Sequence, residues 1–120
     1  MDTKNDVKKF MQACDQNEQG IESAQAKLYL NLIEEEFEEL NKAFRDKDIV
    51  EIADACADLK WVIEGLENTL NLPAQEIWNE VARSNLSKIS ENGKVLKRED
   101  GKVIKPSTFS PPNIKKILED

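Results

Sequence analysis

The sequence contains no histidine among its 120 residues. Histidine is the side chain that most often carries protons near neutral pH, and it is a common ligand of zinc and haem. A histidine general base, Ser-His or Cys-His catalysis, and histidine-ligated zinc or haem are therefore excluded. Any chemistry in this chain must come from carboxylates, lysines, asparagine or a bound metal.

Long apolar runs are also missing. None approaches the roughly 20 residues that a membrane-spanning helix needs, and the first six residues contain no apolar core of a signal peptide. Only two cysteines occur, Cys14 and Cys56. Two cysteines can pair, but both sit at helical spacings, and we expect free thiols in a cytoplasmic protein that does not enter a membrane.

Positive charge is scarce: 17 basic residues face 24 acidic ones, for a formal net charge of -7. This balance argues against a nucleic-acid polymer or an anionic membrane as the partner. It fits a soluble acidic protein or one that collects cations. A chain of 120 residues is predicted to form one domain, with room for a modest core.

Four segments show the apolar periodicity of amphipathic helices. The spacing predicts helices over residues 3–15, 23–46, 49–70 and 73–89. Ser23 and Asp48 are the predicted N-caps of the second and third helices, and Pro73 stands where a helix tolerates proline. The predicted fold is an all-α, four-helix bundle-like domain over residues 1–120, whose helical part spans residues 3–90.

The character of the chain changes after Gly93. Two short alternating runs flank Asp100-Gly101, which predicts a β-hairpin over residues 93–105. This segment carries five basic and two acidic residues. Residues 106–112 have the composition of a loop, and residues 113–118 form either a short helix or a docking tail. A short basic hairpin and tail over residues 93–120 therefore complete the predicted domain.

The second predicted helix carries five glutamates within residues 34–39. At about 100° per residue, Glu34 and Glu38 fall on a mixed-charge side that faces water. The other three, Glu35, Glu36 and Glu39, share an arc with leucines beside a packed face. Carboxylates there are costly unless a cation or a hydrogen-bond donor neutralises them. The main apolar arc comprises Tyr29, Ile33, Phe37, Leu40 and Phe44.

The third predicted helix repeats this pattern. Glu51, Asp54 and Asp58 cluster in an arc about 60° wide, beside a core arc that comprises Ile52, Leu59, Ile63, Leu66 and Leu70. Two such helices joined by a short connection pack antiparallel, so the two carboxylate stripes can face each other. The alternative, in which the glutamates are only helix formers on a solvated face, stays open.

Facing stripes would bring five or six carboxylates together, and divalent cations would relieve their repulsion. Hard oxygen ligands without histidine or thiolate favour Mg²⁺ or Mn²⁺ over zinc. Such a site activates water for attack on phosphorus and neutralises a leaving pyrophosphate. The basic hairpin can then supply lysine and arginine to the phosphate oxygens.

Two further residues have both a structural and a functional interpretation. Trp61 lies beside the carboxylate arc, although tryptophan is more often a core residue. Asn85 lies in the apolar stripe of the fourth predicted helix, where a buried amide needs a partner. Because Lys88 follows one turn later, we interpret Asn85 as a ligand contact, with a helix–helix hydrogen bond as the alternative.

The acidic motif resembles that of a known superfamily. Glu35-Glu36-x-x-Glu39 followed by Glu51-x-x-Asp54 resembles the EExxE…ExxD signature of the all-α nucleotide pyrophosphohydrolases, which include MazG-like proteins, dimeric dUTPases and phosphoribosyl-ATP pyrophosphohydrolases. The stretches 81–88 and 98–106 are similar to the phosphoribosyl-ATP-pyrophosphohydrolase-like MazG branch. The resemblance covers about residues 28–112.

This resemblance implies a helical bundle that oligomerises and binds Mg²⁺. The metal ligands that it implies are Glu35, Glu36, Glu39, Glu51 and Asp54, and in a second register Asp58 takes the position of the family's aspartate. Glu35 or Glu36 would orient the attacking water. The implied phosphate or sugar ligands are Asn85, Lys88, Arg98 and Lys102, to which we add Trp61 as a substrate-binding candidate.

The sequence therefore predicts a Mg²⁺-dependent enzyme that hydrolyses nucleoside triphosphates to monophosphates and pyrophosphate and clears surplus or non-standard nucleotides. We expect a homodimer or a homotetramer. A narrower substrate, dUTP or phosphoribosyl-ATP, is the first alternative. A non-catalytic helical interaction module, with the acidic stripes as its partner surface, is the alternative of another class. A di-iron bundle would normally need histidines, and the chain has none.

Overall fold

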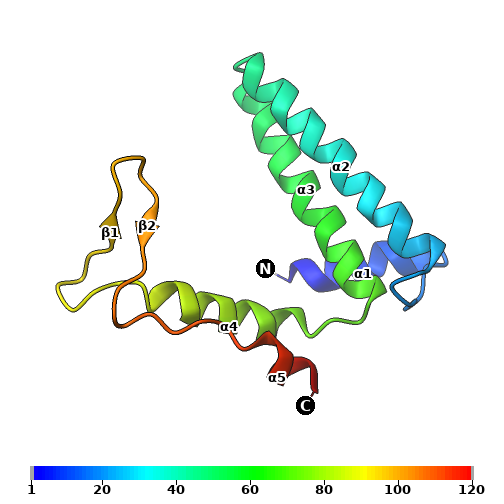
Figure 1. Cartoon of the computed structure of the whole chain (residues 1–120). Coiled ribbons are helices and arrows are strands. Elements are labelled where there is room, and N and C mark those ends of the chain that lie inside the picture. Colours follow the sequence, from blue (N-terminus) through cyan, green and yellow to red (C-terminus); the bar gives the residue numbers. More distant parts are fainter. Residues whose placement is uncertain (1, 120) are drawn as a thin grey trace. The chain divides into compact units, whose positions relative to one another are not determined.

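The computed structural model describes residues 2–119 and divides the chain into two compact units, Met1–Leu72 and Pro73–Asp120. Unit 1 contains α1 (Thr3–Ala13), α2 (Ala24–Arg45) and α3 (Ile49–Thr69). Unit 2 contains α4 (Ala74–Leu86), β1 (Leu96–Lys97), β2 (Val103–Ile104) and α5 (Ile114–Glu119) (Figure 1). The prediction of a mostly helical chain with four main helices and a small C-terminal hairpin is confirmed.

The helix ends follow local side-chain chemistry. The Ser23 hydroxyl accepts a hydrogen bond from the Ala26 amide at 3.0 Å, and an Asp48 carboxylate oxygen accepts one from the Glu51 amide at 3.2 Å. Both predicted N-caps are thus confirmed. Helix α1 stops two residues earlier than predicted, at Ala13, and Asp15 then turns to a φ of 58°.

Helices α2 and α3 lie side by side and antiparallel along one narrow seam (Figure 1). On α2 the seam contains Tyr29, Glu36 and Ala43, each seven residues from the next. On α3 it contains Ala55, Asp58, Val62, Gly65 and Thr69. All of these are buried except Glu36 and Asp58, which are half-buried. A seven-residue repeat keeps one stripe of a helix against its partner, so both carboxylates lie in the packed contact.

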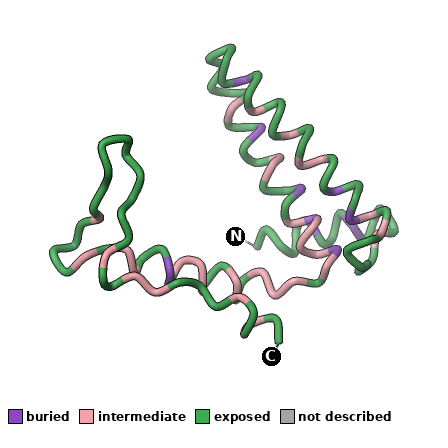
Figure 2. The backbone as a smooth tube through the Cα atoms, in the orientation of Figure 1, coloured by how far each residue is buried: buried purple, intermediate pink, exposed green. Residues whose placement is uncertain are grey.

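Small residues let the two helices approach closely. Gly65 faces the Tyr29 ring, and a Cβ atom added at Gly65 would lie 2.1 Å from a ring carbon. The Tyr29 hydroxyl is held by a 2.6 Å hydrogen bond that it donates to Gln16. Val7 and Met11 of α1 pack against Tyr29 and close the core of unit 1. Figure 2 marks the buried positions along the backbone.

The prediction that the large apolar arc of α2 forms the core is only partly right. Tyr29 is buried and Ile33 packs against the core, but Phe37 and Phe44 are 54% and 71% exposed. On α3, Ile63 is 41% exposed. The closely spaced seam accounts for this, because it turns the small residues and the carboxylates inward and leaves the bulky side chains outside.

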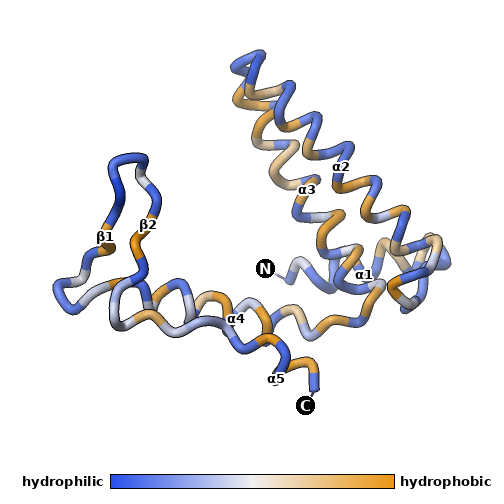
Figure 3. The backbone as a smooth tube through the Cα atoms, viewed as in Figure 1, coloured by the Kyte–Doolittle hydropathy of each residue, from blue (hydrophilic) through white to orange (hydrophobic). Residues whose placement is uncertain are grey.

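The C-terminal hairpin follows the predicted Asp-Gly turn. Strands β1 and β2 pair antiparallel, with Leu96 opposite Ile104 and Lys97 opposite Val103. Gly101 has a φ of 87°, a conformation that glycine adopts without strain. Each strand is only two residues long, and the connecting tip is hydrophilic (Figure 3). Along residues 2–119, no helix combines the length and the apolar character needed to cross a membrane.

Candidate functional site

Four carboxylates gather where α2 faces α3: Glu36, Glu39, Asp54 and Asp58, here called the carboxylate cluster. Burial raises the pKa of Glu36, and the charges of Glu39, Asp58 and Asp54 and a hydrogen bond with Glu39 raise it further. Burial also raises the pKa of Asp58, together with the charge of Asp54, a hydrogen bond with Asp54 and the charge of Glu39. The structure therefore brings the two predicted stripes together across the seam.

Glu36 holds the most unusual position in this cluster. Its Oε2 atom is buried and has no hydrogen-bond partner among the described residues. A carboxylate oxygen without a donor or a cation loses the solvation it has in water, which is costly in a packed interior. Packing requirements alone would favour a small apolar residue between Tyr29 and Ala43. The orphaned oxygen therefore indicates a site that a ligand completes.

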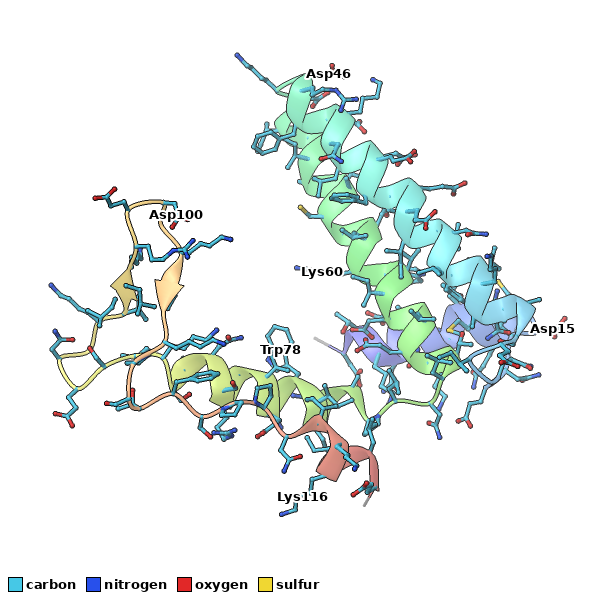
Figure 4. All side chains as sticks on the ribbon, viewed as in Figure 1. Asp15, Asp46, Lys60, Trp78, Asp100 and Lys116 are labelled. Atoms are coloured by element: carbon cyan, nitrogen blue, oxygen red, sulfur yellow. The ribbon has the colours of Figure 1, made fainter. Side chains whose placement is uncertain are left out.

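Glu35 and Glu51 lie at the rim of the cluster rather than within it. Both are exposed. Glu51 and Glu39 line a surface hollow of about 340 Å³. It lies at the end of the α2–α3 helix pair where Asp46 caps α2 (Figure 4). Glu35 and Glu39 line a second hollow, which also contains Glu38. The prediction placed Glu38 in water and Glu35 on metal, whereas the structure exposes both.

The donor chemistry of the carboxylate cluster fits a hard divalent cation. All of its candidate ligands are carboxylate oxygens, and neither a thiolate nor an imidazole lies among them. Mg²⁺ and Mn²⁺ prefer such ligands. Within residues 2–119, the side chains do not converge on one point as three or more preformed ligands of a metal ion. The fit therefore rests on the donor type and on the unpartnered oxygen of Glu36.

Trp61 packs against α1 instead of standing free. Its ring meets the Phe10 ring edge-on, with centroids 5.7 Å apart and planes at 76°. The Trp61 side chain is still 38% exposed. This partner gives Trp61 a structural role in unit 1, and its exposed part is the only portion that a ligand can reach.

The predicted phosphate ligands all belong to unit 2. Asn85 is exposed, so the expectation that it lies at the centre of a buried stripe is wrong. Its side-chain Oδ1 atom accepts a 2.9 Å hydrogen bond from Lys88 Nζ. Arg98 donates two hydrogen bonds to Asp100, at 3.3 Å and 2.5 Å. Asp100 also accepts the Lys102 amide at 3.0 Å, at the hairpin tip (Figure 4). The charge of Arg98 is therefore already balanced.

Lys105 and Phe109 lie near Lys88, and neither was identified from the sequence as a site residue. The ammonium groups of Lys88 and Lys105 lie 5.7 Å and 5.0 Å from the centre of the Phe109 ring. One signal was present in the sequence, because Phe109 is the only aromatic residue after Trp78 and stands in the loop that follows the basic hairpin.

The helical fold and the paired carboxylate stripes are those of an all-α nucleotide pyrophosphohydrolase. A model of the phosphoribosyl-ATP pyrophosphohydrolase family matches residues 6–85, two thirds of the chain, and the chain belongs to this family. It is therefore a hydrolase that acts on phosphoric anhydrides, in a family that generally uses a divalent metal. No curated protein matches the chain. The matched segment contains the carboxylate cluster and ends before the hairpin.

Proposed function

We propose that this protein is a Mg²⁺-dependent nucleoside triphosphate pyrophosphohydrolase that releases pyrophosphate and a nucleoside monophosphate. The observation that carries this proposal is the carboxylate cluster, with the unpartnered Glu36 oxygen inside a helix seam. Membership of a pyrophosphohydrolase family supports the reaction type. The same membership favours phosphoribosyl-ATP as the narrower alternative substrate.

Glu36, Glu39, Asp54 and Asp58 are the residues that would hold the cation, with Glu35 and Glu51 at the rim. A bound Mg²⁺ would supply Lewis-acid neutralisation of the phosphate oxygens. Of the two candidates for orienting the attacking water, Glu36 is favoured over Glu35, because it has a free oxygen in the cluster. A carboxylate there can accept a water proton while the bond between the α-phosphorus and the leaving pyrophosphate breaks.

The residues of unit 2 would meet the phosphate or the sugar. Lys88 and Lys102 are the free cations of the predicted set, because neither forms an ion pair with a carboxylate within residues 2–119. Arg98 is held by Asp100, so it would have to exchange that partner in order to bind substrate. Asn85 serves first to orient Lys88.

The decisive experiment measures pyrophosphate release from a panel of nucleotides that includes the four dNTPs, dUTP and phosphoribosyl-ATP, with and without Mg²⁺. Glu36→Gln should reduce kcat/KM by about 100-fold or more, since loss of groups that merely support a metal ligand already costs 10- to 100-fold. Glu34→Gln is the matched control on the exposed side of α2 and should keep its activity. Absence of hydrolysis across the panel, or full activity in Glu36→Gln, would overturn the proposal.

A non-catalytic interaction module makes a different prediction about the fold. If the carboxylate cluster binds Mg²⁺ only in the native state, the cation raises the melting temperature. An interaction module with solvated acidic stripes would show no such rise. A thermal melt with and without Mg²⁺, repeated on Glu36→Gln, separates the two functions without requiring a known substrate.

We also propose that a second copy of the chain covers the bulky apolar residues that the seam leaves outside, so that the protein is a homodimer or a homotetramer. Phe37, Phe44, Ile49 and Val50 are each more than half exposed, and exposed apolar patches of this kind mark interfaces. Sedimentation at micromolar concentration should show a dimer or a tetramer. Phe44→Glu should shift it towards the monomer, and a monomeric unchanged chain would contradict this assignment.

The free, exposed thiols of Cys14 and Cys56 support a reducing compartment, and we propose the cytoplasm.

A further inference from the structure

Two lysines and a phenylalanine form a cluster in unit 2, here called the lysine–phenylalanine site. Lys88 lies just after α4, Lys105 directly follows β2, and Phe109 stands in the tail loop. Both ammonium groups lie within 6 Å of the same ring centre, at 5.7 Å and 5.0 Å. At this range the negative face of an aromatic ring attracts a cation. Two positive charges therefore lie beside the same ring.

Hydrogen bonds formed by its two sequence neighbours hold Phe109 in this position. Thr108, on one side of Phe109, donates a 2.9 Å hydrogen bond from its hydroxyl to the Ser87 carbonyl. Ser110, on the other side, donates its amide to the Ser87 hydroxyl at 2.8 Å. That hydroxyl donates in turn to the carbonyl of Ser84, which is buried. Because Ser87 directly precedes Lys88, these contacts fix the ring beside that lysine.

The two lysines differ from the two arginines of unit 2 in their surroundings. Within residues 2–119, neither Lys88 nor Lys105 forms an ion pair with a carboxylate, whereas Arg83 and Arg98 of the same unit do. Lys88 donates to the neutral carbonyl oxygen of Asn85. Each ammonium has three donors, so most of them remain available. Two such groups beside one ring repel each other, and an anion bound to both would relieve this repulsion.

We propose that Lys88 and Lys105 together bind a phosphate group of the nucleotide, with Phe109 as the residue that positions them. This inference rests on the proposed function, because a nucleotide supplies the phosphate. A phosphate offers three charged oxygens as acceptors and forms short, strong hydrogen bonds with cationic donors. The phosphate belongs either to the polyphosphate chain or to a sugar, and binding measurements distinguish these two sources.

The first test is calorimetric binding to the full chain without metal, in one arm with inorganic tripolyphosphate and in the other with ribose 5-phosphate. Binding in the first arm alone assigns the polyphosphate chain, and binding in the second alone assigns a sugar phosphate. Lys88→Gln and Lys105→Gln should each weaken the binding about 10-fold, the effect of one charge-assisted hydrogen bond. Lys116→Gln removes one exposed charge from α5 and is the matched control, with binding within about twofold of the unchanged chain.

The positioning role of Phe109 requires variants that keep both charges. Phe109→Leu should weaken binding about threefold, because an exposed cation–π contact contributes about 0.5–1 kcal/mol. Phe109→Tyr and Lys105→Arg should both retain binding, since ring and charge are preserved. Equal affinities in Lys105→Gln, Lys116→Gln and the unchanged chain, or no binding in either arm, would overturn the site.

Kinetics separate this inference from the proposed function. With the nucleotide that is hydrolysed, Lys105→Gln should raise KM about 10-fold and change kcat by less than about threefold, as expected when a binding contact is lost. Hydrolysis with an unchanged KM in Lys105→Gln would overturn the phosphate site and leave the proposed function intact. Tripolyphosphate binding that depends on both lysines, in a chain that hydrolyses no nucleotide, would overturn the proposed function and leave the site intact.

Discussion

The two units of this molecule carry net charges of opposite sign. Residues 1–72 contain 17 acidic and eight basic residues, a net charge of -9, whereas residues 73–120 contain seven acidic and nine basic ones, a net charge of +2. In unit 1, four carboxylates gather at the helix seam, and two of them, Glu36 and Asp58, are half-buried. In unit 2, two lysines lie beside one aromatic ring. Unit 1 thus suits a cation and unit 2 suits an anion.

The pKa shifts repeat this contrast. In unit 1, burial and like charges raise the pKa values of Glu36 and Asp58. In unit 2, the side chain of Arg83 and the amide of Asn113 lower the pKa of Glu80 to about 2, and Arg98 lowers that of Asp100. A carboxylate whose neighbours disfavour its charge is a candidate for a functional site when it lies in a cluster such as this one. A carboxylate already paired with arginine instead stabilises the local structure.

The largest effect on unit 1 should come from Gly65→Ala. In an open helix this change stabilises by about 1 kcal/mol, but here the new Cβ would overlap the Tyr29 ring at 2.1 Å. Tyr29 is buried and its hydroxyl is bonded to Gln16, so the ring cannot withdraw freely. Overpacking should lower the free energy of unfolding by about 2 kcal/mol, measured by urea denaturation.

Gly20→Ala is the matched control, because no heavy atom lies within 4 Å of a Cβ added there. It should leave the free energy of unfolding within about 0.5 kcal/mol of the unchanged chain. If Gly65→Ala were equally stable, the close seam between α2 and α3 would be wrong.

The next largest effect concerns the charge buried in the seam. Glu36→Gln removes the repulsion by Glu39, Asp54 and Asp58 and should stabilise the metal-free chain by about 1 kcal/mol, or about 4 °C in melting temperature. The same change should abolish most of the stabilisation by Mg²⁺. One variant that is more stable without metal and less responsive to metal would show that unit 1 gives up stability for its site. A lower melting temperature without metal would contradict the seam position of Glu36.

The helices of unit 1 could be predicted from the sequence because their ends and faces depend on nearby residues. Ser23 and Asp48 begin helices because a short polar side chain can accept an amide hydrogen of the first turn, and this needs no tertiary information. The facing of Glu36 and Asp58 was predicted from helical periodicity. The exposure of the bulky apolar residues was not predicted, because a helical wheel ranks the faces of a helix by hydrophobicity. The contact between α2 and α3 is instead set by the small size of Gly65 and Ala43. The seven-residue spacing of Tyr29, Glu36 and Ala43 was the signal that would have identified the seam.

Unit 2 was harder to predict for a related reason. The hairpin followed from Asp100-Gly101, a local turn signal. The approach of Phe109 to Lys88 depends on hydrogen bonds across 21 and 23 residues, from Thr108 and Ser110 to Ser87. No periodicity encodes such contacts. In the sequence, a serine or threonine whose hydroxyl forms such a long-range hydrogen bond cannot be distinguished from one that is exposed to solvent.

Ser87→Ala should therefore have a local effect on unit 2. It removes the acceptor of the Ser110 amide and the donor to the Ser84 carbonyl, which should cost about 1 kcal/mol. Amide hydrogen exchange at Ser110 should accelerate, and tripolyphosphate binding should weaken because the ring is no longer held. Ser107→Ala, at an exposed loop position, is the control. Unchanged exchange at Ser110 would show that the tail is held by other contacts.

The smallest expected effect is the pH response of the tail. Glu80 accepts two hydrogen bonds from Arg83, at 2.7 Å and 2.9 Å, and the Asn113 amide at 2.7 Å. Its pKa is lowered to about 2 from an ordinary 4.5, so the ionised form is favoured in the folded state. The stabilisation is therefore fully present above pH 4.5 and is lost as the pH falls through about 2.

An NMR titration of the Glu80 carboxyl carbon should show its midpoint near 2, and the protection of the Asn113 amide against exchange, relative to its intrinsic rate at each pH, should fall over the same range. Arg83→Gln removes the largest cause of the shift and should move the midpoint upwards, while the Asn113 hydrogen bond keeps it below 4.5. A midpoint near 4.5 in the unchanged chain would mean that Glu80 does not hold the tail. The opposite signs of the Glu80 and Glu36 shifts would then no longer distinguish the two units.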